Sequence, residues 1–154
     1  MTETTVNPLD EIDLALLTIL QSEGRLSGAD LGRRVGLSQP AVSARLQRLE
    51  RSGTISGYRA VVDPIRLGLN IHAVVRLRTT HARIAEAITL FDELAEVTSF
   101  YRLTGEDCFL DDIHAVNALR LEQIVDSIAR FGPVTTSLVL REYAPKPIQP
   151  ATAR

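Results

Sequence analysis

The sequence contains little cysteine, no tryptophan and no long hydrophobic run. The single cysteine, Cys108, excludes an intrachain disulfide, so nothing ties the fold to an oxidising compartment. No apolar stretch approaches the roughly 18 residues that cross a bilayer, and residues 1–8 lack the basic opening and apolar core of a secretory signal. We therefore expect a cytoplasmic protein with no membrane partner. At 154 residues, the chain has room for one medium domain or two small ones.

Charge is distributed unevenly, although the net charge is only −2. Residues 1–24 carry five acids and no base, whereas residues 25–66 carry eight arginines against three acids, a local charge of +5. Residues 67–154 are again slightly acidic. A basic block inside an acidic chain indicates a localised contact with a polyanion, with a solvated arginine-rich helix face as the alternative.

The first third of the chain has the signals of three helices. Apolar residues at helical spacing predict a helix over residues 9–22. A second helix opens at Ser27, where a capping box is possible, and ends at Gly36. A third opens at Ser38 and ends at Gly53. Two helices joined by a short turn with glycine, the second rich in arginine, are typical of a DNA-binding helix-turn-helix.

The residues that follow predict a wing and then a different domain. Residues 55–62 alternate loosely and predict a small hairpin, and residues 63–69 predict a hinge. Within residues 70–143, alternating and helical patterns predict the order βαββαβ, the arrangement of ferredoxin-like α+β folds. The expected strands and helices are residues 71–77, 81–94, 97–103, 108–115, 117–131 and 134–143. Residues 144–154 include three prolines and are expected to form a flexible tail.

One ordered set of residues carries a family resemblance. It consists of Leu9-Asp10-x-x-Asp13, Gly24-Arg25-Leu26-Ser27, Leu31, Gly36-Leu37-Ser38, Val42-x-x-Arg45-Leu46-x-x-Leu49-Glu50-x-x-Gly53-x-Ile55, Asp63-Pro64 and Gly68. This pattern resembles the Lrp/AsnC family of bacterial and archaeal transcription regulators, and the resemblance extends to about Tyr143. It implies a winged helix-turn-helix over residues 1–62, then a hinge and a ferredoxin-like domain that senses amino acids. The resemblance further implies a homodimer formed through the sheet, and assembly to an octamer.

The third helix supplies the candidate DNA-binding residues. Those that lie away from its apolar stripe, and so can face a major groove, are Ser38, Gln39, Pro40, Ser43, Ala44, Gln47, Arg48 and Arg51. Glutamine suits adenine edges, and arginine suits guanine edges or phosphates. Arg59, in the expected wing, can reach a phosphate. Arg45 lies beside the apolar stripe and can pair equally well with Glu50 or with an acid of the first helix.

The loop between the two middle strands is the candidate effector site. Its residues are Thr104, Gly105, Glu106 and Asp107, with Thr135, Thr136 and Ser137 as expected neighbours. A glycine lets backbone amides approach a carboxylate, an acid can pair with an ammonium group, and hydroxyls can complete the hydrogen bonds. The family commonly has Gly-x-x-Asp here, whereas this chain places its acid one residue earlier, at Asp107. A plain polar turn is the alternative.

The second domain contains further polar residues on its strands. His72, Arg76, Asp112 and His114 should share one sheet face, where an ion-paired dimer face is favoured over a metal site because a flat sheet offers no closed coordination geometry. Asp111 should instead point beneath the helices, where an unpaired carboxylate is costly. A bulge, a change of register or an effector contact would each account for Asp111.

Catalytic signals are sparse, so we expect no enzyme activity, no cofactor and no metal. The sequence has no phosphate-binding loop, no zinc-protease histidine pair and no second cysteine. The alternative is a sirohaem decarboxylase, because such enzymes resemble this family in both halves and would use histidine and arginine to hold a tetrapyrrole. A stand-alone amino-acid-binding module is disfavoured by the basic helix-turn-helix. The favoured function is a DNA-binding transcriptional regulator that responds to a small amino acid or related metabolite.

Overall fold

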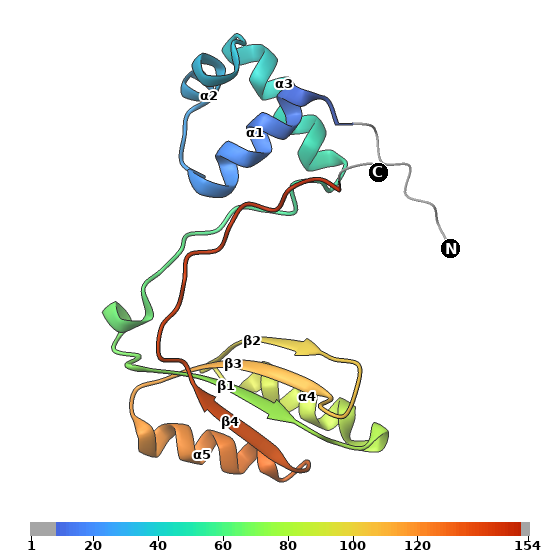
Figure 1. Ribbon diagram of the computed structural model, residues 1–154, viewed down its shortest axis with the longest axis vertical. Helices are drawn as coiled ribbons and strands as arrows, with labels where there is room; N and C mark the ends of the chain where they lie inside the picture. Colours follow the sequence, from blue (N-terminus) through green and yellow to red (C-terminus); the bar gives the residue numbers. More distant parts are fainter. Residues whose placement is uncertain (1–8, 152–154) are drawn as a thin grey trace. The chain divides into compact units, whose positions relative to one another are not determined.

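The computed structural model describes residues 9–151, which form two compact units (Figure 1). Residues 9–61 and 144–151 belong to the first unit, and residues 62–143 form the second. The described residues exclude 1–8, the segment tested above for a secretory signal, and 152–154, the end of the predicted tail. No helix in the described part is long and apolar enough to span a membrane.

The first unit contains three helices: α1 (Glu11–Ser22), α2 (Gly28–Val35) and α3 (Gln39–Arg51). Asp10 caps α1 through a reciprocal capping box with Asp13, and Ser27 accepts a hydrogen bond from a backbone amide of α2. Each cap satisfies a backbone amide that the helix itself leaves without a partner. The predicted helix starts are therefore confirmed. Ser38 occupies the N-cap position of α3 but makes no side-chain capping bond.

A small apolar core holds these helices together. Leu16, Leu31 and Val42 are buried, one from each helix. The turn between α2 and α3 is tight: Gly36 has a φ of 71°, and a Cβ atom on Gly32 would lie 2.4 Å from the carbonyl oxygen of Leu37. Only glycine permits such an approach of backbone to backbone, so the sequence fixes the angle at which α3 leaves α2.

The hairpin predicted over residues 55–62 is absent. This segment contains no strand, and the chain runs extended until a 3-10 helix, Pro64–Leu67, begins in the predicted hinge. Residues 55–62 have no paired neighbouring strand within the described chain, so they do not form a hairpin. The described part of the first unit is therefore a helix-turn-helix without a wing hairpin.

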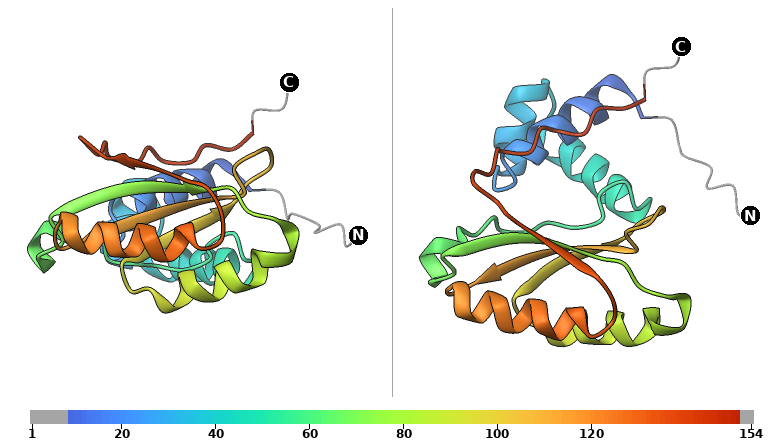
Figure 2. Two further views of the ribbon diagram at one scale, coloured as in Figure 1. Left: turned by 90° about the horizontal axis from the view of Figure 1, so that it is seen from below. Right: turned by 60° about the horizontal axis from the view of Figure 1, so that its bottom comes forward.

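The second unit has the predicted βαββαβ order. Its strands are β1 (Ile71–Leu77), β2 (Val97–Arg102), β3 (Phe109–Ala115) and β4 (Val134–Leu138). They form one antiparallel sheet in the order β2-β3-β1-β4. Helices α4 (Ile84–Glu93) and α5 (Ala118–Ala129) cover the same face of the sheet (Figure 2). β4 ends at Leu138, earlier than the predicted Tyr143.

Burial alternates along the central strands, as expected for a sheet covered on one side. Val75, Leu77, Phe109 and Ile113 are fully buried against the helices, together with Phe91 of α4. The opposite face of the same strands carries the polar residues predicted to share it. The alternation therefore separates an apolar core from an uncovered polar face, and both faces matter for the sites described below.

Candidate DNA-binding and effector sites

Helix α3 presents most of the residues proposed for DNA contact on an accessible surface. Ser38, Gln39, Pro40, Ala44, Gln47 and Arg51 are exposed, and Ser43 and Arg48 are half-buried. The helix buries Val42 and Leu49 against the rest of the unit, which leaves its other side uncovered. This arrangement is the one that a reading helix needs, because its buried stripe fixes orientation while the polar side stays free.

A buried carboxylate anchors two arginines of this helix. The Asp13 side chain, from α1, is 1% exposed. It accepts hydrogen bonds from Arg48 Nη2, at 2.7 and 2.6 Å, and from Arg45 Nη1, at 2.8 Å. Arg45 Nη1 also donates to Asp10, at 2.6 Å. The acids of the first helix, and not Glu50, are therefore the partners of Arg45.

The charges of this cluster compensate each other. Burial by itself raises the pKa of Asp13, but the hydrogen bonds from Arg48 and Arg45 outweigh it and hold the pKa below the usual value. Removing one partner of such a buried pair leaves an uncompensated charge, which is strongly destabilising. The cluster therefore locks α3 to α1.

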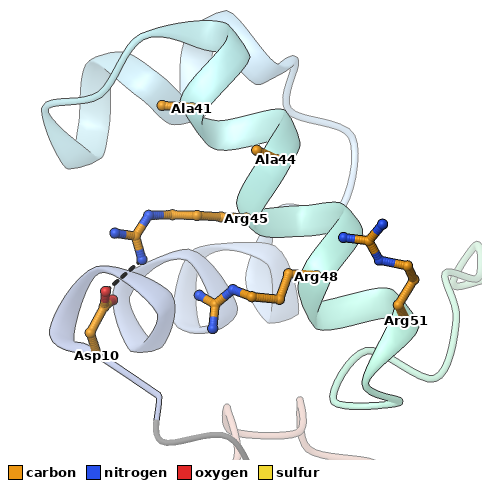
Figure 3. Close-up of a pocket in the computed structure, with 6 residues that line it drawn as sticks. All are labelled: Asp10, Ala41, Ala44, Arg45, Arg48 and Arg51. Atoms are coloured by element: carbon orange, nitrogen blue, oxygen red, sulfur yellow. Dashed lines mark hydrogen bonds and ion pairs between the residues drawn. The ribbon is translucent and has the colours of Figure 1, made fainter.

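The locked arginines line a shallow groove along α3 (Figure 3). Its lining residues are Asp10, Ala41, Ala44, Arg45, Arg48 and Arg51, and its volume is about 590 Å³. Arg45 and Arg48 reach toward α1, whereas Arg51 lies further along α3 and does not reach α1. Arg48 is therefore committed to Asp13, which the sequence spacing did not indicate. Arg51 has no acidic partner among the described residues.

The second arginine proposed for phosphate contact lies outside the helices. Arg59 is exposed on the extended segment after α3. This segment is tied to α3 by a hydrogen bond from the Tyr58 hydroxyl to Glu50, at 2.9 Å. Arg59 thus keeps an accessible guanidinium beside the unit even though the wing hairpin is absent.

The loop proposed to bind the effector lies at one end of the sheet. Residues 104–107 connect β2 to β3, and Gly105 there has a φ of 105°, a backbone conformation that favours glycine. Asp107 lies 3.8 Å from Arg76 of β1, and Glu106 pairs with Arg78. The two arginines were not among the proposed effector residues. Arg76 and Arg78 come close to the loop because β1 pairs with β3, and this pairing joins strands that are distant in sequence.

Strand β4 brings only part of its predicted set to this face. Thr135 pairs with Arg76 and Ser137 pairs with Val74, so both share the uncovered face. Thr136 pairs with the buried Val75 and lies on the opposite face of the sheet. All three residues are exposed. The arrangement therefore gathers Thr135, Arg76 and Asp107 as one polar cluster.

Cys108 stands where the family pattern commonly has an acid, and it has a structural partner. Its thiol donates to the carbonyl oxygen of Thr79, at 3.1 Å. Hydrogen bonding from the Thr79 backbone amide, followed by the side chain of Arg102, lowers the pKa of this thiol. Cys108 thus joins the loop to the end of β1.

The uncovered sheet face carries the predicted polar group. β1 and β3 are neighbours, and His72 Nε2 lies 2.6 Å from Asp112 Oδ1. The rings of His72 and His114 stack, with centroids 4.2 Å apart. The described residues contain no cluster of three or more side chains suited to a metal ion. The contacts among His72, Asp112 and His114 confirm the prediction that these side chains share one face of the sheet.

Asp111 points under the helices, as the alternation predicted. It is fully buried, and neither carboxylate oxygen has a hydrogen-bond partner among residues 9–151. Desolvation raises its pKa to about 7. Asp111 pairs in register with Val75 and with Phe100, and the register shift in β2 lies further along, between Val97 and Ser99. A bulge at Asp111 therefore does not account for this burial.

Comparison with known proteins covers both units. Residues 9–50 match the AsnC-type helix-turn-helix domain, and residues 72–148 match the Lrp/AsnC ligand binding domain. The chain belongs to the Lrp/AsnC family. It is 33% identical to the HTH-type transcriptional regulator Ptr1 of Methanocaldococcus jannaschii over 140 residues, which cover 88% of this chain and 94% of that protein.

Solved structures of the family agree with the fold. The structure of LrpC from Bacillus subtilis has a TM-score of 0.84 at 29% identity, covering 90% of this chain and 99% of that one. A transcriptional regulator of Neisseria meningitidis in complex with L-methionine also has a TM-score of 0.84, at 28% identity, covering 94% of this chain and 98% of that one. The predicted fold class and family are therefore confirmed, and this Lrp/AsnC protein is a DNA-binding regulator with a ligand-responsive domain.

Proposed function

We propose that this Lrp/AsnC protein binds duplex DNA through the exposed side of α3 and that a small amino acid controls this binding. The observation that carries the DNA half is the position of α3, which Asp13 locks to α1 while Gln39, Gln47 and Arg51 remain accessible. Rigid placement of a few polar side chains is what base recognition in a major groove requires.

The arginines of the unit take different roles in this proposal. Arg51 and Arg59 contact phosphates, because their guanidinium groups are exposed. Arg48 acts mainly by holding α3 in place, since Asp13 occupies its guanidinium. Gln47 reads a base edge. Substitution of Arg48 therefore affects folding of the unit as well as affinity, whereas substitution of Arg51 affects affinity alone.

Gel-shift titration with the DNA upstream of the protein's own gene tests this assignment. We expect Arg51→Ala to weaken binding to all sequences and to make the salt dependence of log K shallower by about 0.9, the value for one phosphate contact. Gln47→Ala should instead lower the preference for the specific site by roughly 5-fold or more. Unchanged affinity and salt slope for both variants would refute the role of α3.

Arg33→Ala is the matched control. Arg33, like Arg51, is exposed, but it lies on α2, where it pairs with Asp30 at the surface. Its substitution removes the same charge from the same unit without touching α3. An effect of Arg33→Ala equal to that of Arg51→Ala would show that overall charge, rather than α3, determines affinity.

The effector half of the proposal rests on the polar cluster at the end of the sheet and on the nearby pair of Arg78 and Glu106. Arg76 and Arg78 offer guanidinium groups to a carboxylate, and Glu106 and Asp107 offer carboxylates to an ammonium group. An amino acid carries both a carboxylate and an ammonium group, so its two charges match the two arginines and the two acids. The relative from Neisseria meningitidis, whose structure contains L-methionine, supports this ligand class.

A thermal-shift screen of the twenty amino acids identifies the effector, and calorimetry then tests the site. We expect Arg76→Gln and Asp107→Asn each to weaken binding at least about 10-fold, because each leaves a ligand charge unpaired. Gly105→Thr should do the same through its strained backbone. Asp126→Asn, an exposed change on α5, is the control. Parent-like affinity in Arg76→Gln and Asp107→Asn would place the site elsewhere.

We further propose that the working form in the cytoplasm is a homodimer that can assemble to an octamer. Leu110, Val74 and Tyr101 lie on the uncovered sheet face, and Tyr101 is 54% exposed. Pairing two such faces removes apolar surface from water. Light scattering that gives the mass of a monomer at micromolar concentration would contradict the dimer.

The proposal includes no enzyme activity. A sirohaem decarboxylase would need His72 and His114 to hold a tetrapyrrole, whereas His72 is engaged with Asp112 and stacked on His114. A shift of a porphyrin's visible absorption band on addition of the protein would show binding and would favour the enzyme.

A further inference from the structure

The outer side of α1 has a groove that the proposed function does not use. The α1 groove is defined by Leu9, Leu14, Leu17, Thr18, Leu20 and Gln21. Residues 54–61 form a second wall, and Pro145, Ile148, Gln149 and Pro150 form a third. The volume of the groove is about 980 Å³. All of these segments belong to the first unit. The C-terminal segment runs along α1 (Figure 2).

Gln21 holds the C-terminal segment by its backbone. The Gln21 Nε2 atom donates to the carbonyl oxygen of Ile148, at 3.2 Å, and the Ile148 amide donates to Gln21 Oε1, at 2.7 Å. One side-chain amide thus satisfies both polar groups of one residue, as a neighbouring strand would. The Ile148 side chain is 84% exposed, so the contact recognises extended backbone rather than this side chain.

The composition of the segment suits this mode of binding. Pro145, Pro147 and Pro150 fix their own φ angles near the extended value and restrict the residue before each of them. A segment that is already extended loses less conformational entropy when it docks. The prolines also lack amide hydrogens, so Ile148 and Gln149 are the only backbone donors between Pro147 and Pro150.

We propose that residues 144–151 are a docking segment of the DNA-binding unit, held against α1 of the same chain by Gln21, where the segment forms one wall of the α1 groove. The chain leaves this unit at Val61 and re-enters it at Ala144. The unit therefore has two covalent connections to the ferredoxin-like unit, and the second continues the chain beyond β4. The segment predicted as a flexible tail is in this proposal an ordered part of the helix-turn-helix unit.

Amide exchange measured by NMR on the full-length protein tests the hydrogen bonds. We expect the Ile148 amide to exchange about 10-fold or more slowly than in an unstructured peptide of the same sequence. Gln21→Leu removes both hydrogen bonds and should restore the peptide rate. An Ile148 amide that exchanges at the peptide rate in the parent protein would overturn the proposal.

Two substitutions in the segment itself separate docking from a general loss of folding. Ile148→Pro removes the donor while keeping an extended backbone, so the Gln21 side-chain amide signals should move to the positions of a free glutamine. Ile148→Ala keeps the donor and removes only an exposed side chain, so these signals should stay in place. Signals that respond equally to both substitutions would contradict backbone recognition.

Cross-linking tests whether the segment docks on its own chain. Thr18 and Gln149 both line the α1 groove, so cysteines placed at these two positions, with Cys108→Ser, can be joined by a short bismaleimide. We expect the linked product to keep the mass of one chain on a denaturing gel. A product with the mass of two chains would assign the groove to the segment of a second copy and overturn the proposal.

Discussion

We expect the buried carboxylate of Asp111 to make the ferredoxin-like unit less stable as pH rises toward 7. Burial raises the pKa of Asp111 from 3.8 to about 7, and within the described part of the chain neither oxygen has a partner that would offset this cost. In the unfolded chain the same group ionises near its ordinary pKa of about 3.9. Folding therefore takes up a proton between about pH 4 and pH 7.

The sign and size of the effect follow from this difference. Below about pH 4 both states are protonated, and the carboxyl group costs no ionisation energy. As pH rises toward 7, the unfolded state loses its proton first, so the free energy of unfolding falls. A pKa difference of about 3 corresponds to about 4 kcal/mol, so the free energy of unfolding is lower by about this amount above pH 7 than below pH 4. This loss is large against the roughly 5–15 kcal/mol that stabilises a typical domain.

Substitution by an apolar side chain should remove the cost. We expect Asp111→Val to raise the free energy of unfolding at pH 8 by about 3 kcal/mol or more, and to flatten its dependence between pH 5 and pH 8. Urea unfolding followed by circular dichroism measures the change, and exchange of the slowest β1 and β3 amides assigns it to this unit. Asp126→Asn, an exposed carboxylate on α5, is the control.

Two results would refute this reasoning. A parent protein equally stable at pH 5 and pH 8 would show that Asp111 stays ionised in the fold or finds a partner. An Asp111→Val variant less stable than the parent at pH 8 would show that the position cannot accept an apolar side chain. Either result would remove Asp111 as the source of the pH dependence.

Two further changes test the helix-turn-helix unit. Asp13→Ala should destabilise it by about 1–3 kcal/mol, because Arg45 and Arg48 lose their hydrogen bonds to Asp13 but remain partly exposed to water. The effect on thermal unfolding should disappear as pH falls below the lowered pKa of Asp13, and a neutral result at pH 7 would mean that this cluster does not hold α3. Gly32→Ala should lower the free energy of unfolding in urea by about 1–3 kcal/mol, since the new Cβ would lie 2.4 Å from a backbone oxygen. Gly57→Ala is the control and should be nearly neutral, because nothing lies within 4 Å of its added Cβ. Equal effects of the two substitutions would show that the turn between α2 and α3 can shift to accommodate a side chain.

Local signals in the sequence predicted most of the fold. The capping residue Ser27 and the turn glycine Gly36 marked helix ends correctly, because a cap or a positive φ is decided by atoms a few residues apart. The same holds for the strands, whose alternation assigned each residue to a sheet face. Asp111 was thus placed beneath the helices from alternation alone.

The sites depended more on contacts between distant residues. Arg48 looked like a DNA contact because it lies off the apolar stripe, yet Asp13, 35 residues earlier, binds it. Arg76 joined the effector cluster only because antiparallel pairing places it near Asp107 and Thr135. In the same way, the hairpin predicted over residues 55–62 needed pairing that the described chain does not provide.

The sequence by itself determined the family, the order of the elements and the faces of the strands, since these rest on local hydrogen bonding and on periodicity. Only the tertiary structure decided which charges meet. Asp13 binds two arginines and Asp111 binds none, although both are buried aspartates. The two aspartates differ because tertiary packing places arginines beside Asp13 and apolar side chains around Asp111, and these neighbours set the free energy of a buried charge.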